Sequence, residues 1–202
     1  MNISDYKKLL DAVTQGTGDS DQHLLTLFGL AIGSGGKTFI ELGVRDGQTT
    51  LPLVMAAKNN GGKLYSVDLS PPPNNISKEY LPHLEYFQQD AIEFLGSWDK
   101  SKDIDFIFID DWHSYEHVKK ELSILDTLVS PRTVIVLHDL MYGNTCPFYH
   151  ADLSVDTGQW ASGGPYRAVA ELNPQFWEYA TIPYNNGLTL LRKKYSSKYK
   201  QK

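Results

Sequence analysis

Acidic and amide side chains stand at, or directly after, the ends of successive apolar, strand-like runs. They are Glu41, Asp68, Gln89 with Asp90, Asp110 with Asp111, and Asp139 after His138. Because the carboxyl ends of parallel strands lie along one edge of a sheet, we expect these groups to face a common ligand. Carboxylates accept hydrogen bonds from hydroxyls and balance positive charge, so the set predicts a hydroxyl-bearing, cationic small molecule. Each acid taken alone is more often a helix cap or a solvated loop acid, whereas five in succession on one edge favour a ligand.

A glycine-containing turn follows the first of these acids in the segment "TFIELGVRDGQTTLPLV", residues 38–54. Gly43 and Gly47 carry no side chain, so the turn is predicted to let a ligand lie against bare backbone. The spacing differs from the G-x-G-x-x-G of dinucleotide-binding folds, and the turn lacks the lysine followed by Ser or Thr of a Walker-type loop. Neither of those two motifs explains the turn.

Apolar runs alternate with helical periodicity over most of the chain, which predicts an α/β fold with a mostly parallel sheet. Expected strands cover 37–42, 63–67, 84–88, 104–109 and 132–138, and expected helices cover 4–14, 20–32, 48–58, 76–81, 90–97, 114–129 and 165–172. The segment "FWEYATIPYNNGLTLLRK" predicts two further strands joined through "YNNG" in an antiparallel hairpin. We therefore expect a Rossmann-like, doubly wound sheet of seven strands.

Length and composition favour one domain over residues 1–202, with N-terminal helices in 1–33. The stretch 140–164 interrupts the strand-helix rhythm and is predicted to be a lid, since long irregular loops at ligand edges are often functional. Its aromatic residues support a cover over a ligand: Tyr142, Phe148, Tyr149 and Trp160. Residues 193–202 are polar and basic and are expected to form a flexible tail.

Charge and cysteine content narrow the classes of partner. A net charge of −5 lacks the basic footprint of nucleic-acid binders. The single cysteine, Cys146, allows neither an internal disulfide nor a cysteine-based zinc cluster. No apolar run reaches membrane-spanning length, and the first residues lack the apolar stretch of a signal peptide. We expect a cytoplasmic protein without nucleic-acid or membrane partners.

Several motifs, in order, resemble those of class I S-adenosylmethionine-dependent methyltransferases. "IELGVRDGQTT" is similar to their E-x-G-x-x-x-G cofactor loop, "LYSVDLS" to the segment with the ribose-binding acid, and "FQQDAIEFL" to the adenine-side loop. "IDFIFIDDWHSYEHVKKEL" and "TVIVLHDL" resemble a bacterial small-molecule O-methyltransferase subgroup related to cephalosporin hydroxylase-type and macrolide-sugar enzymes. The resemblance covers about residues 20–192 and implies S-adenosylmethionine as cofactor.

The resemblance also implies roles for individual residues. Glu41 is expected to face the cofactor near its amino-acid or ribose end, Asp68 to take the ribose hydroxyls, and Asp90 with Gln89 to lie beside adenine. The expected cofactor-binding set is Glu41, Gly43, Gly47, Thr49, Asp68, Gln89, Asp90 and Asp110. The expected catalytic set is His113 as general base, Asp110 and His138.

A divalent metal, Mg or Mn, is a further expectation of the resemblance, with Asp110, Asp139 and His138 as its ligands. Metal-dependent relatives carry two oxygen ligands after the fifth strand, whereas this chain has His138 and Asp139. An imidazole suits Mn, Fe or Zn better than Mg. Alternatively, His138 is a second base and no metal binds. Asp111 is an alternative ligand, although alternation along an extended chain directs it away from Asp110.

The acceptor is expected to be a small hydroxylated molecule such as a carbohydrate or a secondary metabolite. Residues in and after the predicted lid are candidates for contacting it: Tyr142, His150, Trp160, Tyr166 and Arg167. Two other readings stay open, an N-methyltransferase and a cofactor-binding module without catalysis. The Asn-Pro-Pro-Tyr type of motif expected of base methylation is absent after the fourth strand, where "IDDWHS" stands. Self-association into a homo-oligomer is compatible with the sequence.

Overall fold

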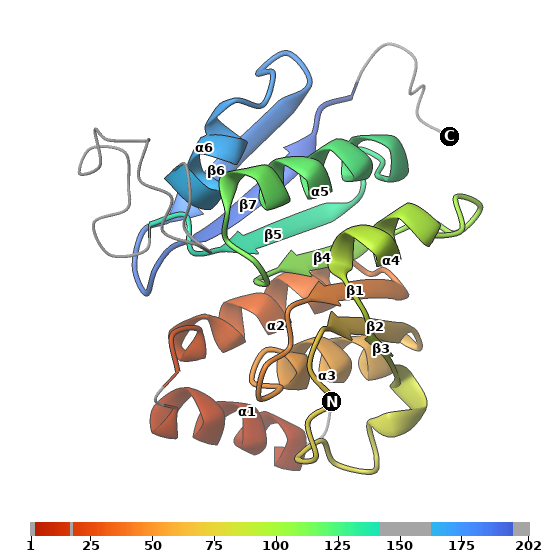
Figure 1. Cartoon of the computed structure of the whole chain (residues 1–202). Helices are drawn as coiled ribbons and strands as arrows, with labels where there is room; N and C mark the ends of the chain where they lie inside the picture. The colour runs from red at the N-terminus through yellow and green to blue at the C-terminus, as the bar shows by residue number, and fades with distance from the viewer. Residues whose placement is uncertain (1–2, 17, 142–162, 196–202) are drawn as a thin grey trace.

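One mixed sheet of seven strands, in the order β3-β2-β1-β4-β5-β7-β6, forms the centre of the computed structural model (Figure 1). The structure describes residues 3–16, 18–141 and 163–195. The strands are β1 Thr38–Leu42, β2 Lys63–Asp68, β3 Leu84–Gln88, β4 Phe106–Ile109, β5 Val134–His138, β6 Trp177–Ile182 and β7 Leu188–Lys193.

The first five strands are parallel, and the last two are attached in antiparallel fashion. β1 pairs with both β2 and β4, and β5 pairs antiparallel with β7, which in turn pairs antiparallel with β6. The β6–β7 turn contains Asn185, Asn186 and Gly187, all at positive φ, as the "YNNG" signal predicts. The predicted Rossmann-like α/β fold with a C-terminal hairpin is confirmed.

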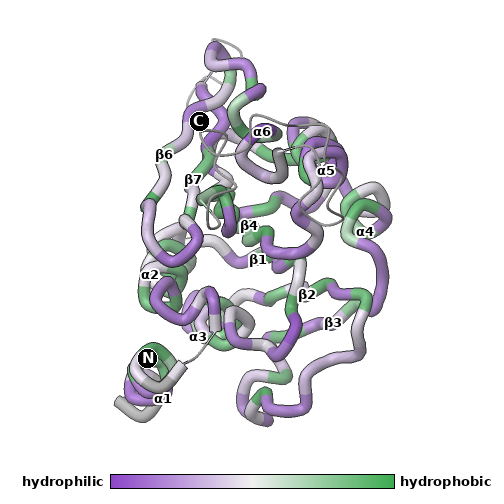
Figure 2. The backbone as a smooth tube through the Cα atoms, turned by 60° about the vertical axis from the view of Figure 1, so that its left-hand side comes forward, coloured by the Kyte–Doolittle hydropathy of each residue, from purple (hydrophilic) through white to green (hydrophobic). Residues whose placement is uncertain are grey.

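Helices cover both faces of the sheet, and Figure 2 shows the two groups on opposite sides of it. One face is covered by α1 Ile3–Gln15, α2 Leu24–Gly33 and α3 Thr50–Asn60, and the other by α4 Ala91–Ser97, α5 Tyr115–Leu128 and α6 Gly164–Ala170. Short 3₁₀ helices lie at Asp21–His23 (η1) and Leu81–His83 (η2). Because both faces are covered, the central strands are almost continuously apolar, as in other parallel sheets.

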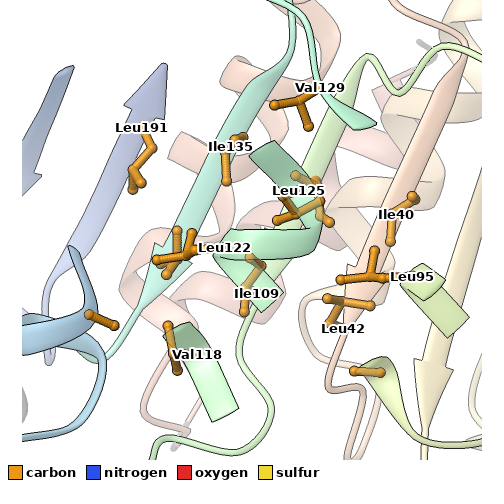
Figure 3. Packing of buried hydrophobic residues seen from close by; sticks show 14 of the residues in the cluster. Ile40, Leu42, Leu95, Ile109, Val118, Leu122, Leu125, Val129, Ile135 and Leu191 are labelled. Atoms are coloured by element: carbon orange, nitrogen blue, oxygen red, sulfur yellow. The ribbon is translucent and has the colours of Figure 1, made fainter. Parts of the chain in front are cut away.

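The packing of α5 against the sheet shows how its periodicity positions the site. Val118, Leu122 and Leu125 recur at the spacing of one helical face, and all three are buried (Figure 3). They pack in the same apolar cluster as Ile109 of β4 and Ile135 of β5. Truncating Leu122 to alanine would cost about 2 to 5 kcal/mol of stability. This packing fixes the helix that begins directly after the β4 loop, where the candidate catalytic residues lie.

The structure differs from the sequence-based expectations at three places. The expected helix over 76–81 is wrong: turns cover most of this stretch, and only the 3₁₀ helix Leu81–His83 follows. Pro82 in that short helix has no N–H to donate. The expected helix over 20–32 begins as η1 and continues as α2. The basic tail begins later than expected, because Lys193 ends β7 and pairs with Asp126 at 3.0 Å. Most of the predicted lid, residues 142–162, lies outside the described residues, as does Cys146.

Candidate active site

A cavity of about 840 Å³ opens at the carboxyl ends of β1 to β5. Its volume is in the range of small-molecule sites. Most of the acids and amides expected at this edge lie on its wall, together with the first glycine: Gly43, Asp68, Gln89, Asp90, Asp110, Asp111, His113 and Asp139. A second cavity of about 490 Å³ adjoins it between the segment before α2 and the glycine turn. The strand-end constellation predicted from the sequence is thus brought together around one cavity.

The glycines of the turn are required by packing, whereas the sequence predicted that they make room for a ligand. Gly43 has a φ of +85°, and a Cβ atom there would lie 2.1 Å from the carbonyl oxygen of Asp110. Gly47 has a φ of +77°, and its Cβ would lie 2.9 Å from Pro73. In both cases the added Cβ atom would collide with a neighbouring loop rather than project into the cavity. Gly43 permits the close approach of the loops after β1 and β4, whereas Gly47 admits the proline-rich loop.

Glu41 does not face the cavity, which corrects the expectation of a direct cofactor contact. Its side chain is fully buried and accepts hydrogen bonds from Ser66 at 2.6 Å, Thr49 at 2.8 Å and Thr50 at 2.8 Å. Burial raises the pKa of Glu41 to about 7, although these hydroxyls act in the opposite direction. Thr49 is buried beside it and belongs to the same network. Glu41 therefore ties β1 to β2 and to the start of α3 beneath the glycine turn.

Asp68 joins the glycine turn to the cavity wall. Its Oδ2 accepts hydrogen bonds from the backbone N–H groups of Val44 at 2.7 Å and Arg45 at 2.9 Å, and its Oδ1 accepts one from Ser70 N–H at 2.7 Å. Burial alone would raise the pKa of Asp68, but these backbone donors lower it below its usual value. The carboxylate is therefore ionised and rigidly held. Oδ2 already accepts two of these donors, whereas Oδ1 accepts one and keeps a lone pair with which to accept a hydrogen bond from a ligand hydroxyl.

Gln89 and Asp90 lie on the wall next to Asp68. The backbone N–H of Gln89 donates to the carbonyl of Asp68 at 3.0 Å. Asp90 caps α4, because its Oδ1 accepts from Ile92 N–H at 2.8 Å and Glu93 N–H at 3.1 Å. The helix-cap reading of Asp90 is therefore realised, while its position on the cavity wall keeps it next to any bound ligand.

The loops after β4 and β5 bring a histidine between two carboxylates. Nε2 of His113 lies 2.9 Å from Oδ2 of Asp139 and 3.3 Å from Oδ1 of Asp110. Asp139 adopts a φ of +67°, a conformation that Asp and Asn tolerate better than most residues. All three side chains line the cavity. Asp110 also accepts a hydrogen bond from the Ser20 hydroxyl at 3.2 Å.

His138 lies behind this group and does not line the cavity. Its Nδ1 lies 3.4 Å from Oδ1 of Asp110 and 3.2 Å from Oδ1 of Asp139. Its Nε2 lies 2.9 Å from the carbonyl oxygen of Asn185, to which an Nε2–H would donate. The side chain is only 1% exposed. His138 is thus placed to orient the two carboxylates rather than to contact an acceptor, which corrects its expected catalytic role.

The two carboxylates control the charge of both histidines. Burial would lower the pKa of His113, but Asp110 and Asp139 raise it to about 9. The same opposing effects raise the pKa of His138 to about 10. Burial would raise the pKa of Asp110, but the two histidines hold it well below its usual value. These shifts favour the ionised form of both carboxylates and the positively charged imidazolium form of both histidines at neutral pH.

The donor set of this cluster fits a divalent cation. One ligand atom each from Asp110, His113 and Asp139 lies within 4.8 Å of the others. Two carboxylate oxygens and one imidazole nitrogen suit manganese or zinc better than magnesium. The histidine of this ligand set is His113, whereas His138 was expected from the sequence. The residues therefore fit a metal, with His138 behind its carboxylate ligands.

Several residues near the site were not anticipated from the sequence. His23 of η1 is fully buried, with Nε2 3.0 Å from the carbonyl oxygens of Tyr184 and Asn185, and its ring stands edge-on to His138. Asp19 lines the cavity and pairs with Arg45 at 3.0 Å. These contacts join segments that are distant in sequence, so local patterns carry no signal for them.

Two other expectations concern residues around the acceptor side. Arg167 pairs with Glu171 at 3.0 Å and lies over the ring of Tyr115, so its guanidinium is engaged on α6 rather than on the cavity wall. Tyr166 is partly buried on the same helix. Tyr142, Phe148, Tyr149, His150 and Trp160 lie outside the described residues.

The comparison that decides the family concerns the segment that carries this site. A family model described as a methyltransferase domain matches residues 40–140, half of the chain. The chain belongs to this methyltransferase family. The matched residues run from within β1 to two residues past the end of β5 and include every cavity-lining acid except Asp19. A comparison with curated proteins finds no match.

Solved structures share the fold of this methyltransferase at low sequence identity. An O-methyltransferase from Bacillus cereus in complex with S-adenosylhomocysteine is 17% identical, with a TM-score of 0.69, over 96% of this chain and 92% of that one. The O-methyltransferase TomG from Streptomyces achromogenes, involved in tomaymycin synthesis and solved with S-adenosylmethionine, is 15% identical, with a TM-score of 0.70, over the same shares of the two chains. Among the helices in the described ranges, none has the length and apolar character needed to span a membrane.

Proposed function

We propose that this methyltransferase transfers a methyl group from S-adenosylmethionine to a hydroxyl of a small acceptor, such as a sugar or a secondary metabolite. The observation that carries the proposal is the position of His113, held between Asp110 and Asp139 on the wall of the same cavity as Asp68, Gln89 and Asp90. The residues proposed to bind the cofactor and the residue proposed to accept the proton thus line the same cavity.

The polar groups that follow β2 and β3 suit the cofactor. Asp68 is ionised and rigid, and its Oδ1 is placed to accept a hydrogen bond from a ribose hydroxyl. Gln89 and Asp90 lie next along the wall, beside the expected adenine. When bound, the cofactor supplies an electrophilic methyl group on a sulfonium. The acidic cavity compensates that positive charge, with Glu41 holding the turn from below.

His113 is the proposed general base for the acceptor hydroxyl. Transfer to oxygen would form a C–O bond as the bond between sulfur and the methyl group breaks and S-adenosylhomocysteine leaves. The hydroxyl loses its proton in this step, so a group near the acceptor must take that proton. Nε2 of His113 accepts a proton only when the imidazole is neutral, yet Asp110 and Asp139 raise its pKa to about 9. A positively charged ligand bound beside Asp110 and Asp139 would lower the pKa of His113 again. The base is therefore expected to become competent when the site is loaded.

Asp110, His113 and Asp139 are the residues that would hold a divalent cation in the cavity. Such a cation would polarise an acceptor hydroxyl and lower its pKa. If His113 is a ligand, its Nε2 is not free to act as base, so the two roles are alternatives. In the metal-free alternative, Asp110 and Asp139 orient the acceptor and the imidazole.

Transfer to oxygen is supported by the solved structures of similar fold, several of which are described as O-methyltransferases. At these identities they support the fold directly and the acceptor atom only by analogy. The acidic wall would disfavour nucleic acid and other polyanionic acceptors.

The test is a turnover screen with methyl-labelled S-adenosylmethionine against hydroxylated sugars, phenols and matched amines. Label on oxygen, dependent on His113, is the expected result. Label on nitrogen would favour the N-methyltransferase alternative. Binding of the cofactor without label transfer to any member of the panel would favour a module that binds but does not catalyse.

A further inference from the structure

A second cluster of metal-ligating side chains lies beside the candidate active site. Nε2 of His117 lies 2.9 Å from Oδ2 of Asp111 and 3.7 Å from Oε1 of Glu121. One ligand atom from each of the three residues lies within 4.8 Å of the others. His117 and Glu121 are four residues apart on α5, so both project from one face of the helix. The side chain of His117 is only 14% exposed.

Glu121 has no adequate partner for its charge. Its side chain is 0% exposed, and neither Oε1 nor Oε2 has a hydrogen-bond partner among the described residues. The contact with His117 at 3.7 Å exceeds hydrogen-bond length. Oδ1 of Asp111 is likewise buried and without a hydrogen-bond partner among those residues. Buried carboxylates are normally paired or coordinate a metal, so this carboxylate, aimed at His117, indicates a missing ligand.

We propose that Asp111, His117 and Glu121 bind a zinc ion. Zinc binds carboxylate oxygens and imidazole nitrogens, and zinc sites with three protein ligands keep an open coordination position. Burial would lower the pKa of His117, but Asp111 and Glu121 raise it to about 10, so zinc would replace the imidazolium proton. With that proton released, two ionised carboxylates and a neutral imidazole would carry a charge that one divalent cation cancels.

The proposed zinc site is separate from the Asp110 cluster but opens to the same cavity. Asp110 and Asp111 are adjacent in the chain, and one contacts His113 while the other contacts His117. Asp111 and His117 line the cavity, whereas Glu121 lies behind them in the core. A zinc ion held there would present its open position to a ligand in the cavity. The site stands on its own residues and does not depend on methyl transfer.

The main rival is a proton in place of the metal. Burial, followed by the charge of Asp111, raises the pKa of Glu121 well above its usual value, which favours a bound proton on this carboxyl. A proton-sharing triad of this kind would show no metal affinity. Zinc binding has to displace that proton, so affinity should increase with pH.

The experiment uses the full chain carrying Asp110→Asn and Asp139→Asn, so that the first cluster cannot bind metal. We expect this variant to retain one zinc per chain after dialysis, measured by elemental analysis, and to give a cobalt absorption spectrum typical of nitrogen and oxygen ligands. Adding Glu121→Gln should weaken zinc binding by at least about 10-fold, since losing a ligand or its support commonly costs that much. Glu116→Gln, at an exposed position on the same helix, is the matched control and should leave zinc binding unchanged.

The proposal would be overturned if the Asp110→Asn, Asp139→Asn variant bound no zinc. It would also be overturned if adding Glu121→Gln left the zinc affinity of that variant unchanged. Circular dichroism checks that each variant is folded. If Glu121→Gln does not fold, His117→Gln replaces it, with the same weakening expected. If the double variant does not fold, the wild-type stoichiometry is compared with that of the single variants. Binding of S-adenosylhomocysteine, measured in parallel, reports on the proposed function separately.

Discussion

Nε2 of His113 lies 2.9 Å from a carboxylate oxygen of Asp139, although the two residues follow different strands of the sheet. β4 and β5 are parallel neighbours, paired from Phe106 with Val134 to Ile109 with Leu137. Their carboxyl ends therefore meet at the cavity, and the positive φ of Asp139 helps to direct its side chain there. This contact between two loops is the geometric basis of the proposed catalytic group.

Replacing His113 with alanine should lower turnover by about 100-fold or more, because a positioned general base commonly contributes that much. Binding of S-adenosylhomocysteine should change little, since the ribose and adenine side of the cavity is untouched. His83→Gln is the control, because His83 contacts the carbonyl of Gly62 away from the cavity and should leave turnover unchanged. Loss of cofactor binding in the His113 variant would instead indicate a structural role.

Asp68→Ala should weaken binding of S-adenosylhomocysteine by about 1 to 3 kcal/mol, since ribose hydroxyls and the N–H groups of Val44 and Arg45 lose their acceptor. Titration calorimetry measures the change. Glu85→Ala is the control, because this exposed acid pairs with Lys63 on the strand surface. Equal affinities for the Asp68 variant and the wild type would reject the ribose-binding role.

Gly43→Ala should destabilise the fold by about 2 kcal/mol or more, because its Cβ meets the backbone of Asp110 at a positive φ. Gly96→Ala is the matched control: it lies in α4 with open space around it and should stabilise the protein by about 0.5 to 1 kcal/mol. Urea unfolding measures both changes. Equal stability of Gly43→Ala and the wild type would contradict the close approach of the two loops.

Glu41 should make the unfolding free energy depend on pH. Its folded pKa of about 7 lies above the usual 4.5, so the native state binds more protons between these values, and stability falls as pH rises through this window. The loss above pH 7 amounts to about 3 kcal/mol. Glu41→Gln lacks this titration, so its stability relative to the wild type should increase between pH 5 and pH 8. A constant difference across that range would show that Glu41 is not buried as described.

Removal of metal should separate the two catalytic alternatives. If Asp110 and Asp139 hold a cation, a chelator should abolish turnover, and manganese should restore it better than magnesium because of the imidazole in the site. Asp139→Asn keeps the positive φ tolerable and should raise the manganese concentration needed for activity. Full activity in excess chelator, with no metal found by elemental analysis, would leave His113 to act without a cation.

The sequence predicted the fold well where local patterns decide it. The strand over 84–88 is observed with the same bounds, and the two asparagines with Gly187 form the turn between β6 and β7. Such segments are predictable because apolar periodicity and turn chemistry are local. The stretch 76–81 misled the prediction, because it combines helix-forming residues with neighbouring prolines.

The side-chain directions at the site could be predicted only in part. The side chain of Glu41 lies on the same face of β1 as that of Phe39, which packs in the cluster with α2 and α3. Ile40 and Leu42 lie on the opposite face and pack with α4 and α5. Alternation gives this pattern, but only the tertiary structure says which face holds which helices. The contacts of Ser20 and His23 with the site also join segments more than 80 residues apart. The complete burial of Glu121 could not be predicted either, because a charged residue on a helix is usually exposed.

Titration calorimetry of the wild-type chain with S-adenosylhomocysteine tests the central claim most directly, since it requires no knowledge of the acceptor. The account predicts saturable binding at one site per chain, weakened by Asp68→Ala and retained in His113→Ala. Absence of binding by correctly folded wild-type protein, in calorimetry and in thermal shift alike, would contradict the assignment of this cavity to S-adenosylmethionine-dependent methyl transfer.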